Sequence, residues 1–383
     1  MVKNIFRVTA VLLAGTVWSG TSIPSCWDLT GMALFADHWL ESDCHSPDWC
    51  GGMDLDADSR VDMRDVSIVS MYWLDVCEPP VPEDIVPIPG GTFQMGDPLD
   101  EMSNALPVHS VTLSPFYSGK YEVTNGQYRD FLHSALSRGT IYVSNGLVYG
   151  SGNHQIYCDT STSSSYSQII FSTDTFSVGT KGGRTLSDDP VVQVSWYGAA
   201  AYCNWRSEQE ARPPCYDLST WTCDFSKKGY RLPTESQWEY AARGGLSGER
   251  FPWGDTITHS QANYWSSNSF SFDTSPTRGY HPTWNDGAMP YTSPAGSFPA
   301  NGYGLYDTAG NVWEWVNDRS GSSYPTEPET DPTGPATGGT RRLRGGSWVY
   351  GAGLAGGCRV ASRAAAFPTL RGEYIGFRLS LNY

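Results

Sequence analysis

The sequence predicts an α+β fold with little regular secondary structure, preceded by a small helical module that binds calcium. Its 383 residues include 41 Gly, 15 Trp and 22 Tyr. That composition is typical of a loop-rich domain packed around aromatic side chains and differs from that of a helix bundle. Few segments of the long C-terminal part show helical or strand periodicity. Near the N-terminus, evenly spaced aspartates have the spacing of a calcium-binding loop.

Residues 1–20 have the pattern of a secretory signal peptide. Two basic residues precede an apolar run from Val8 to Val17, and small residues follow it. The run is too short for a comfortable membrane span, and no later stretch is long and apolar enough to cross a bilayer. We therefore expect a secreted or extracytoplasmic protein without a membrane span. The alternative is a merely apolar N-terminus.

The charge and the cysteines narrow the classes of function. The formal net charge of -15 argues against nucleic-acid binding, which needs a basic surface. The nine cysteines are an odd number, so at least one thiol is unpaired or bonds another molecule. Export permits disulfides, and Cys44 with Cys50 or Cys215 with Cys223 are close enough in sequence to bridge, although the connectivity stays open. The absence of Cys-x-x-Cys spacing argues against a structural zinc site.

The first predicted domain covers residues 22–78 and contains a twelve-residue loop, residues 54–65. Carboxylates stand at loop positions one, three, five, nine and twelve, and a main-chain carbonyl falls at position seven, as in an EF-hand loop. Ser59 replaces the usual glycine and the last position has aspartate instead of glutamate, so we expect weaker binding or altered geometry. A solvated acidic turn is the alternative. The predicted calcium ligands are Asp54, Asp56, Asp58, Arg60, Asp62 and Asp65.

An internal repeat predicts that this domain is a helical pair. Residues 28–40 and 62–74 match at an offset of 34 residues, and each copy has an apolar helical pattern. The first copy lacks the loop carboxylates, so one working calcium site is expected. The module resembles a divergent type I dockerin, and that resemblance implies a cohesin-bearing scaffold as partner. Residues from Cys26 to Glu78 include two arginines and twelve acidic residues, so we expect this unit to be loosely folded when no metal is bound.

A stiff proline-rich linker, residues 79–84, precedes the large domain, residues 85–383. Short strands are predicted at Val108 and Phe116, and a helix begins at Asn125. Residues 133–190 are rich in Ser, Thr, Gly and Tyr, so we expect surface loops and short hairpins with little chemistry of their own.

Two more helices are predicted over residues 196–208 and 234–242. The second has Thr234 as its N-cap and Gln237 three residues later, which is the capping-box arrangement. After Gly244, regular structure is expected to be sparse until strands at residues 344–347 and 375–380.

The stretch over residues 304–315 places Asp307 and Glu314 on either side of a glycine-containing segment. A turn there would direct backbone carbonyls and two carboxylates toward one point. Ca²⁺ prefers that mixture of oxygen ligands. The alternative is an ordinary core turn with solvated acids.

This stretch and several others resemble the formylglycine-generating enzyme family, also called sulfatase-modifying factors. The resemblance runs in order from about residue 84 to residue 383 and implies that family's fold, which is related to C-type lectins. The other matching segments are residues 88–96, 121–125, 194–197, 201–205, 230–243, 251–254, 344–348 and 376–378.

The resemblance implies two structural calcium ions in the large domain. Each would be held by side-chain and main-chain oxygens, and an aspartate at position 307, where many members have asparagine, still suits such a site. The implied ligands are Asp307, Gly310, Val312 and Glu314 for one ion, and Asn263, Tyr264, Asp286 and Ala288 for the other.

Enzymes of this family oxidise a cysteine of a client sulfatase to formylglycine with O₂ and Cu(I). Two cysteines bind the copper, because Cu(I) selects soft thiolates. They lie three and eight residues past the serine of a Gly-Gly-Ser-aromatic motif, here Ser347. Tyr350 and Ala355 stand there instead, so we expect no copper and assign no catalytic residue. For nearby Cys358 we expect a disulfide with Cys203 or two buried thiols; the alternative is a replacement copper site.

Other candidate sites are weaker. Glu235 and Glu239 share one side of a predicted helix beside arginines, so we expect ion pairs rather than an acid/base pair. Trp313, Trp348 and Tyr350 are candidates for a ligand groove, because aromatic rings with one wet edge suit sugars and peptides.

The sequence therefore favours a secreted, calcium-stabilised binding module without oxidase activity, tethered by its dockerin. Its ligand would be a sulfatase, a peptide or a glycan. The alternatives are an active, divergent oxidase that makes formylglycine in sulfatases, and a component of an extracellular polysaccharide-degrading system.

Overall fold

The computed structural model describes residues 59–62, 64, 81–99, 102–321, 323–349 and 354–382. The chain divides into two compact units, Met1–Pro80 and Val81–Tyr383. In the first unit Ser59 has φ 75°, the left-handed conformation that favours glycine at this loop position. The Asp62 side chain accepts a hydrogen bond from the Arg64 main-chain N–H at 2.8 Å. The predicted signal peptide, the repeat and the other loop carboxylates lie outside the described residues: Asp54, Asp56, Asp58 and Asp65.

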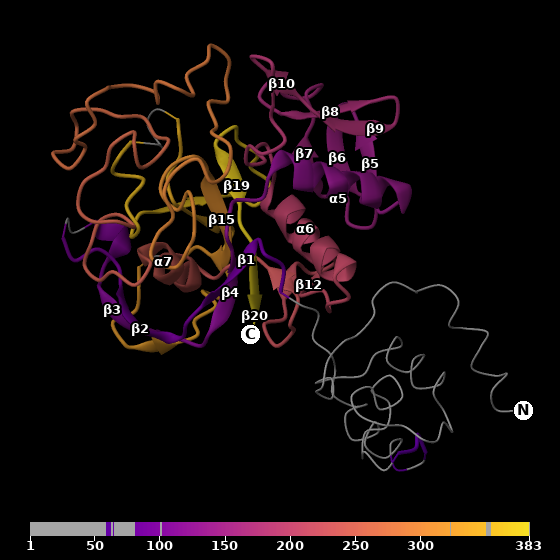
Figure 1. The fold of residues 1–383 in the computed structure, drawn as a ribbon, viewed down its shortest axis with the longest axis horizontal. Helices are drawn as coiled ribbons and strands as arrows, with labels where there is room; N and C mark the ends of the chain where they lie inside the picture. The colour runs from indigo at the N-terminus through magenta and orange to yellow at the C-terminus, as the bar shows by residue number, and fades with distance from the viewer. Residues whose placement is uncertain are drawn as a thin grey trace, which may run out of the picture. The chain divides into compact units, whose positions relative to one another are not determined.

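The second unit combines short strands with three α-helices among the described residues, which confirms the expected mixture of helix and sheet (Figure 1). The strands are β1 (Ile85–Ile88), β2 (Gly91–Met95), β3 (His109–Leu113), β4 (Phe116–Gly119), β5 (Ile141–Ser144), β6 (Leu147–Gly150), β7 (Ile156–Asp159), β8 (Ile169–Ser172), β9 (Thr175–Val178), β10 (Thr180–Lys181), β11 (Arg184–Thr185), β12 (Tyr216–Asp217), β13 (Thr222–Cys223), β14 (Tyr230–Arg231), β15 (Trp313–Arg319), β16 (Glu329–Thr330), β17 (Arg341–Arg344), β18 (Arg363–Ala366), β19 (Ile375–Phe377) and β20 (Ser380–Asn382).

The three predicted helices are confirmed as α5 (Asn125–Ser137), α6 (Trp196–Gln209) and α7 (Glu235–Arg243), and a short 3₁₀ helix, η1, covers Ser103–Ala105. Both α5 and α7 begin with a complete capping box. Helix α7 is capped at its C-terminus by Gly244, whose φ of 59° is the left-handed conformation that commonly closes a helix.

Two four-stranded sheets carry most of the long-range pairing. One has the order β1-β4-β20-β14 and is antiparallel, so the last strand of the chain lies between two earlier ones. The other has the order β18-β17-β15-β19, in which β15 and β19 are parallel. Three-stranded sheets β16-β3-β2 and β5-β6-β7 and the hairpins β8-β9, β10-β11 and β12-β13 complete the unit.

One expectation about strands was wrong, and one strand was not predicted. Residues 344–347 are not a strand, because β17 ends at Arg344 and both following glycines have positive φ. The region after Gly244 also contains β15, which begins at Trp313 and is the longest strand of the unit. Its residues are buried on both faces up to Asp318, so the alternation of polar and apolar residues that marks a half-buried strand is absent.

The core of the second unit contains charged side chains as well as aromatic rings. Trp196 and Trp315 belong to the largest hydrophobic cluster, which α5 and α6 help to build. Helix α6 approaches β7 closely at Gly198, where an added Cβ would lie 2.3 Å from the Tyr157 carbonyl oxygen. Arg231, Arg344 and Arg378 are also buried, and buried charges of this kind require partners.

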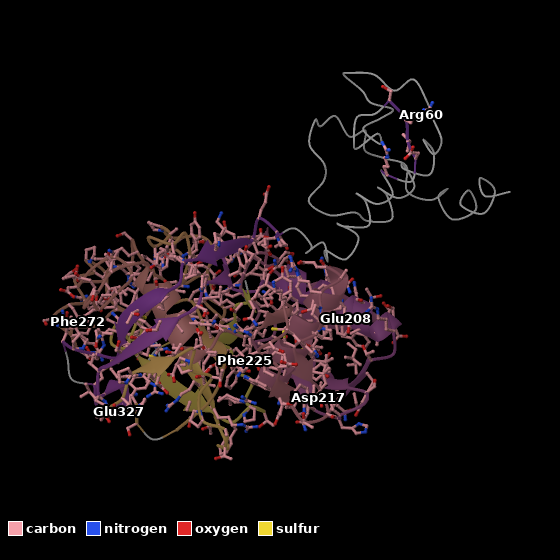
Figure 2. The ribbon with its side chains drawn as sticks, turned by 90° about the horizontal axis from the view of Figure 1, so that it is seen from below. Arg60, Glu208, Asp217, Phe225, Phe272 and Glu327 are labelled. Atoms are coloured by element: carbon pink, nitrogen blue, oxygen red, sulfur yellow. The ribbon has the colours of Figure 1, made fainter. Side chains whose placement is uncertain are left out.

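Figure 2 shows the side chains that fill this unit, with Phe272 and Glu208 at its opposite ends. Phe272 packs against the cluster that contains Ala355 and Cys358. Glu208 belongs to α6. Features near these two residues are therefore well separated.

Candidate functional site

Glu314, one of the predicted calcium ligands, lies in β15 beside the parallel strand β19. Arg378 follows β19 directly and donates two hydrogen bonds to the Glu314 carboxylate, at 2.6 and 2.7 Å. The Trp238 indole N–H of α7 donates a third at 2.7 Å. Both oxygens of the fully buried Glu314 carboxylate are thus bonded by the protein itself.

Asp307 lies close to Glu314, as the sequence predicted, because the chain turns sharply between them. Asp307, Gly310 and Asn311 all have positive φ. Gly310 is required there, since an added Cβ would lie 2.4 Å from the Asn263 carbonyl oxygen. The Asp307 Oδ2 accepts a hydrogen bond from the Gly296 N–H, whereas Oδ1 is buried and finds no hydrogen-bond partner among the described residues.

Glu122 is a third carboxylate in this cluster and was not among the predicted ligands. It is 1% exposed and accepts hydrogen bonds from the Asn311 side chain at 2.6 Å and the Val312 N–H at 3.3 Å. Burial raises the pKa of Glu122 well above its ordinary value, and the charges of Asp307 and Glu314 raise it further. Glu122 lies within residues 121–125, one of the segments that resemble the family, but no sequence pattern links it to Asp307.

The cluster therefore contains three buried carboxylates and one buried guanidinium, that of Arg378. Burial raises the pKa of Asp307 to about 6. In kind, these oxygen donors suit a hard cation, and the unpartnered Asp307 Oδ1 is the atom most available to one. Among the described residues, however, no group of three or more His, Cys, Asp or Glu side chains is arranged to hold a metal ion. A cation here would need main-chain carbonyls such as those of Gly310 and Val312.

Three of the four residues implied for a second calcium ion have other partners in the structure. The Asn263 amide donates to the Tyr291 carbonyl at 2.8 Å, and the Tyr264 carbonyl accepts from the imidazole of His259 at 3.1 Å. Asp286 forms an ion pair with Lys181 at 2.6 Å. Ala288 is exposed. The second site stays a prediction.

The segment where family enzymes carry their copper ligands places Ala355 in the core, fully buried against aromatic side chains. Tyr350 lies outside the described residues. Cys358 is also fully buried, and burial raises the pKa of its thiol well above the ordinary value. A buried thiol with a raised pKa is mostly protonated, and the thiolate is the form that binds metals.

The other described cysteines do not supply a second ligand in this segment. Cys203 lies in a different hydrophobic cluster from Cys358, so no disulfide joins them and the expectation of two buried thiols holds. Cys215 and Cys223 lie on or beside the β12-β13 hairpin and are not bridged to each other.

The tryptophans proposed for a ligand groove are buried. Trp348 is 0% exposed, its indole N–H donates to the Glu373 carbonyl at 3.2 Å, and the rings of Tyr280 and Tyr291 lie 5.9 and 5.4 Å from it. Trp313 is 5% exposed. Neither side chain faces solvent in this structure, and a groove at Tyr350 stays a prediction.

Glu235 and Glu239 are ion-paired, as expected. The Glu235 carboxylate accepts two hydrogen bonds from Arg363, both at 2.6 Å. Glu239 binds Arg344 and, at 2.7 Å, Arg243. Burial alone would raise the pKa of Glu235, but the arginines, first of all Arg363, lower it. Both carboxylates are structural charges rather than an acid and a base.

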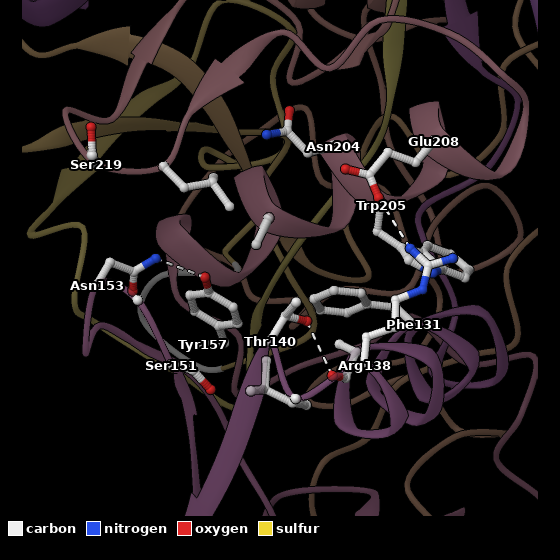
Figure 3. Close-up of a pocket in the computed structure, with 16 residues that line it drawn as sticks. Phe131, Arg138, Thr140, Ser151, Asn153, Tyr157, Asn204, Trp205, Glu208 and Ser219 are labelled. Atoms are coloured by element: carbon white, nitrogen blue, oxygen red, sulfur yellow. Dashed lines mark hydrogen bonds and ion pairs between the residues drawn. The ribbon is translucent and has the colours of Figure 1, made fainter.

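A cavity of about 480 Å³ lies between α5, α6, the β5-β6 hairpin and the loop after β12 (Figure 3). Aromatic side chains and several amides and hydroxyls line it. Residues from Ser151 to Tyr157 contribute to it. The short hairpins expected within residues 133–190 are confirmed by the pairing of β5 with β6, β8 with β9 and β10 with β11. No sequence pattern indicates this cavity, because its walls come from four separate segments.

A family description matches most of the chain: the "Sulfatase-modifying factor enzyme 1-like domain" model matches residues 76–383. A formylglycine-generating enzyme from Streptomyces coelicolor is 33% identical over 322 residues, covering 76% of this chain and 87% of that protein. The corresponding enzyme from Thermomonospora curvata is 34% identical over 321 residues, with coverage of 78% and 93%. "Inactive C-alpha-formylglycine-generating enzyme 2" from Bos taurus is 31% identical over 324 residues, with coverage of 82% and 92%.

Solved structures share the fold. Treponema denticola variable protein 1 is 28% identical, with a TM-score of 0.52, and the match covers 78% of this chain and 95% of that one. PvdO from Pseudomonas aeruginosa is 24% identical, with a TM-score of 0.51 and coverage of 80% and 100%.

Proposed function

The chain belongs to the sulfatase-modifying factor family, and from this membership we propose that it is a divergent member that binds a ligand and has no oxidase activity. The observation that carries the proposal is the fully buried Ala355, which stands where the resemblance requires a copper thiolate. By their names, the relatives of this chain include both formylglycine-generating enzymes and an inactive counterpart. Loss of activity on this fold therefore has a parallel among them.

The donor set near Ala355 does not fit Cu(I). A methyl side chain cannot coordinate a metal. Cys358 offers a thiol in the same cluster, but burial raises its pKa and so favours the protonated form. Cu(I) selects soft, deprotonated sulfur ligands.

The first test is a direct assay for formylglycine. The purified chain would be incubated with Cu(I), O₂ and a cysteine peptide that carries the sulfatase motif, and the product analysed by mass spectrometry. The Streptomyces coelicolor enzyme is the positive control. We expect conversion by the control and none by this chain, because Tyr350 and Ala355 stand at the positions where the resemblance implies copper-binding cysteines.

The alternative, an active divergent oxidase, is favoured by the 33–34% identity to two proteins named as formylglycine-generating enzymes. In that case this chain converts the peptide, and Cys358→Ser abolishes conversion. That pair of results would replace the proposal with the alternative.

We further propose that calcium stabilises both units and that the chain is secreted and tethered by its dockerin-like module to a cohesin-bearing scaffold. Support comes from the aspartate spacing of residues 54–65, from the positive φ of Ser59 and from the excess negative charge around Asp307. Among the described residues, no helix is long and apolar enough to span a membrane. A component of a polysaccharide-degrading system remains a proposal that rests on the dockerin resemblance.

A further inference from the structure

We propose that the cavity between α5 and α6 binds one neutral sugar ring of a glycan. This inference rests on the proposed function, because it gives the binding module a class of ligand. The cavity volume of about 480 Å³ is within the range of small-molecule sites in proteins. It lies wholly within the second unit, and Figure 3 shows the side chains that line it.

Aromatic rings from three elements form the apolar part of the cavity. Trp205 of α6 is partly exposed and supplies the accessible aromatic surface. Phe131 of α5, with its ring centroid 5.8 Å from that of Trp205, and Tyr157 of β7, 6.4 Å from Phe131, also line the cavity but are only 3% exposed. Ile141 and Leu218 add aliphatic surface. The C–H faces of a pyranose ring are apolar and pack on such surfaces, while its hydroxyls point outward to polar groups.

Polar groups that can meet ring hydroxyls stand beside this surface. The Tyr157 hydroxyl accepts a hydrogen bond from the Asn153 amide at 3.0 Å, which leaves the phenolic hydrogen able to donate (Figure 3). Burial raises the pKa of Tyr157, so the phenol keeps its proton at neutral pH. Ser151 adds a hydroxyl to the lining.

The charges of the lining cancel, which favours a neutral ligand. Its charged side chains are Arg138 and Glu208, and they form an ion pair with each other at 3.2 Å. Each is half exposed, so spare N–H groups and carboxylate lone pairs remain for hydrogen bonds. An unpaired charge, which would select an anionic or cationic metabolite, is absent from the residues of this lining.

The cavity is also separate from the segment that lost its copper ligands. Glu208 lies at the end of the second unit opposite Phe272, which packs near Ala355 (Figure 2). Sugar binding and peptide oxidation can therefore be measured independently on one preparation.

The test is a titration of the full chain with small sugars, in which binding is measured by calorimetry and by tryptophan fluorescence. The probes are the uncharged methyl pyranosides of glucose, galactose, mannose and N-acetylglucosamine, with glucuronate as a charged counterpart and N-acetyltyrosinamide as an aromatic competitor. We expect saturable binding of at least one uncharged sugar and weaker binding of glucuronate. Tyr157→Phe removes one hydroxyl and should weaken binding roughly 2- to 12-fold, the value of one hydrogen bond.

Tyr142→Phe is the matched control, because Tyr142 undergoes the same change one residue past Ile141 without lining the cavity. The Tyr142→Phe variant should bind the sugars with the same affinity as the unmodified chain. The inference is wrong if none of the sugars binds, if Tyr157→Phe binds as tightly as the control, or if N-acetyltyrosinamide binds and the sugars do not. Formylglycine production with intact sugar binding would instead overturn the proposed function alone.

Discussion

Individual buried carboxylates in this protein differ in charge because their partners differ. Arg363 keeps Glu235 ionised. Asp318 of β15 is also buried and accepts a hydrogen bond from the Glu235 main-chain N–H at 2.8 Å. Burial raises the pKa of Asp318 to about 7, and the neighbouring Glu235 charge contributes in the same direction.

Asp318 should therefore make the stability of the protein depend on pH. Because its pKa is higher in the folded than in the unfolded chain, its contribution is complete below about pH 4 and is lost as pH rises toward 7. Asp318→Asn keeps an oxygen for the Glu235 N–H and should remove this dependence of the unfolding free energy on pH, which amounts to about 4 kcal/mol at most. Urea unfolding at several pH values measures it.

The exposed Asp174→Asn is the control for that experiment and should follow the unmodified chain at every pH. If Asp318→Asn shows the same change in unfolding free energy between pH 4 and 7 as this control, Asp318 does not titrate as described.

Sequence patterns predicted contacts between residues that are close in the sequence better than contacts between residues that are far apart in it. Asp307 and Glu314 are seven residues apart, and their shared turn was predicted. Glu122 joins them from a distant segment, through hydrogen bonds to Asn311 and Val312. In a single sequence nothing distinguishes Glu122 from an exposed glutamate, since its burial depends on the folded chain.

Helix α7 is the element that organises the ion pairs of the core. Its first residue, Glu235, binds Arg363, and Glu239 one turn later binds Arg344 and Arg243. The Thr234 hydroxyl accepts from the Gln237 N–H at 3.2 Å, and the Gln237 side chain accepts from the Thr234 N–H at 3.2 Å. This capping box was predictable because all its groups lie within one turn.

Thr234→Ala should therefore destabilise the second unit. Loss of an N-cap costs about 1 kcal/mol, with a range of about 0.5–2. The midpoint of urea unfolding should fall while its slope stays unchanged. Thr220→Ala, an exposed threonine in the β12-β13 loop, is the control and should have little effect. Equal stability of the two variants would contradict the role of the cap.

Strand β15 shows why other elements could not be predicted. Polar and charged side chains occupy four of its seven positions, yet all but the last residue are buried. Glu314 forms an ion pair with Arg378, which follows the neighbouring strand, and Asp318 accepts a hydrogen bond from the Glu235 main-chain N–H at the start of α7. Those partners come from other parts of the chain, so the local pattern of hydrophobicity gave no sign of a central strand.

At the scale of the whole molecule, long loops between short strands are held by charge pairs and, we propose, by calcium. A ligand that binds the folded state alone stabilises it by about 2.7 kcal/mol at a hundred times its dissociation constant. Saturating Ca²⁺ should therefore raise the thermal midpoint by several degrees, and EDTA should reverse the rise. Mg²⁺ should substitute poorly, because it demands a smaller and more regular site.

Two variants distinguish the effect of Ca²⁺ on the first unit from its effect on the second. Asp56→Ala should reduce the effect of Ca²⁺ on the first unit, and Asp307→Ala its effect on the second. A thermal midpoint unaffected by either Ca²⁺ or EDTA would contradict the calcium proposal for both.

The most direct measurement for the central claim is a Cu(I) competition titration against a chromogenic chelator. It would compare the unmodified chain with Tyr350→Cys/Ala355→Cys, which puts thiols at both expected positions. We predict that the unmodified chain leaves copper on the chelator and that the double variant removes a stoichiometric amount. Stoichiometric uptake by the unmodified chain, lost in Cys358→Ser, would contradict the account, since this chain would then possess a copper site of its own.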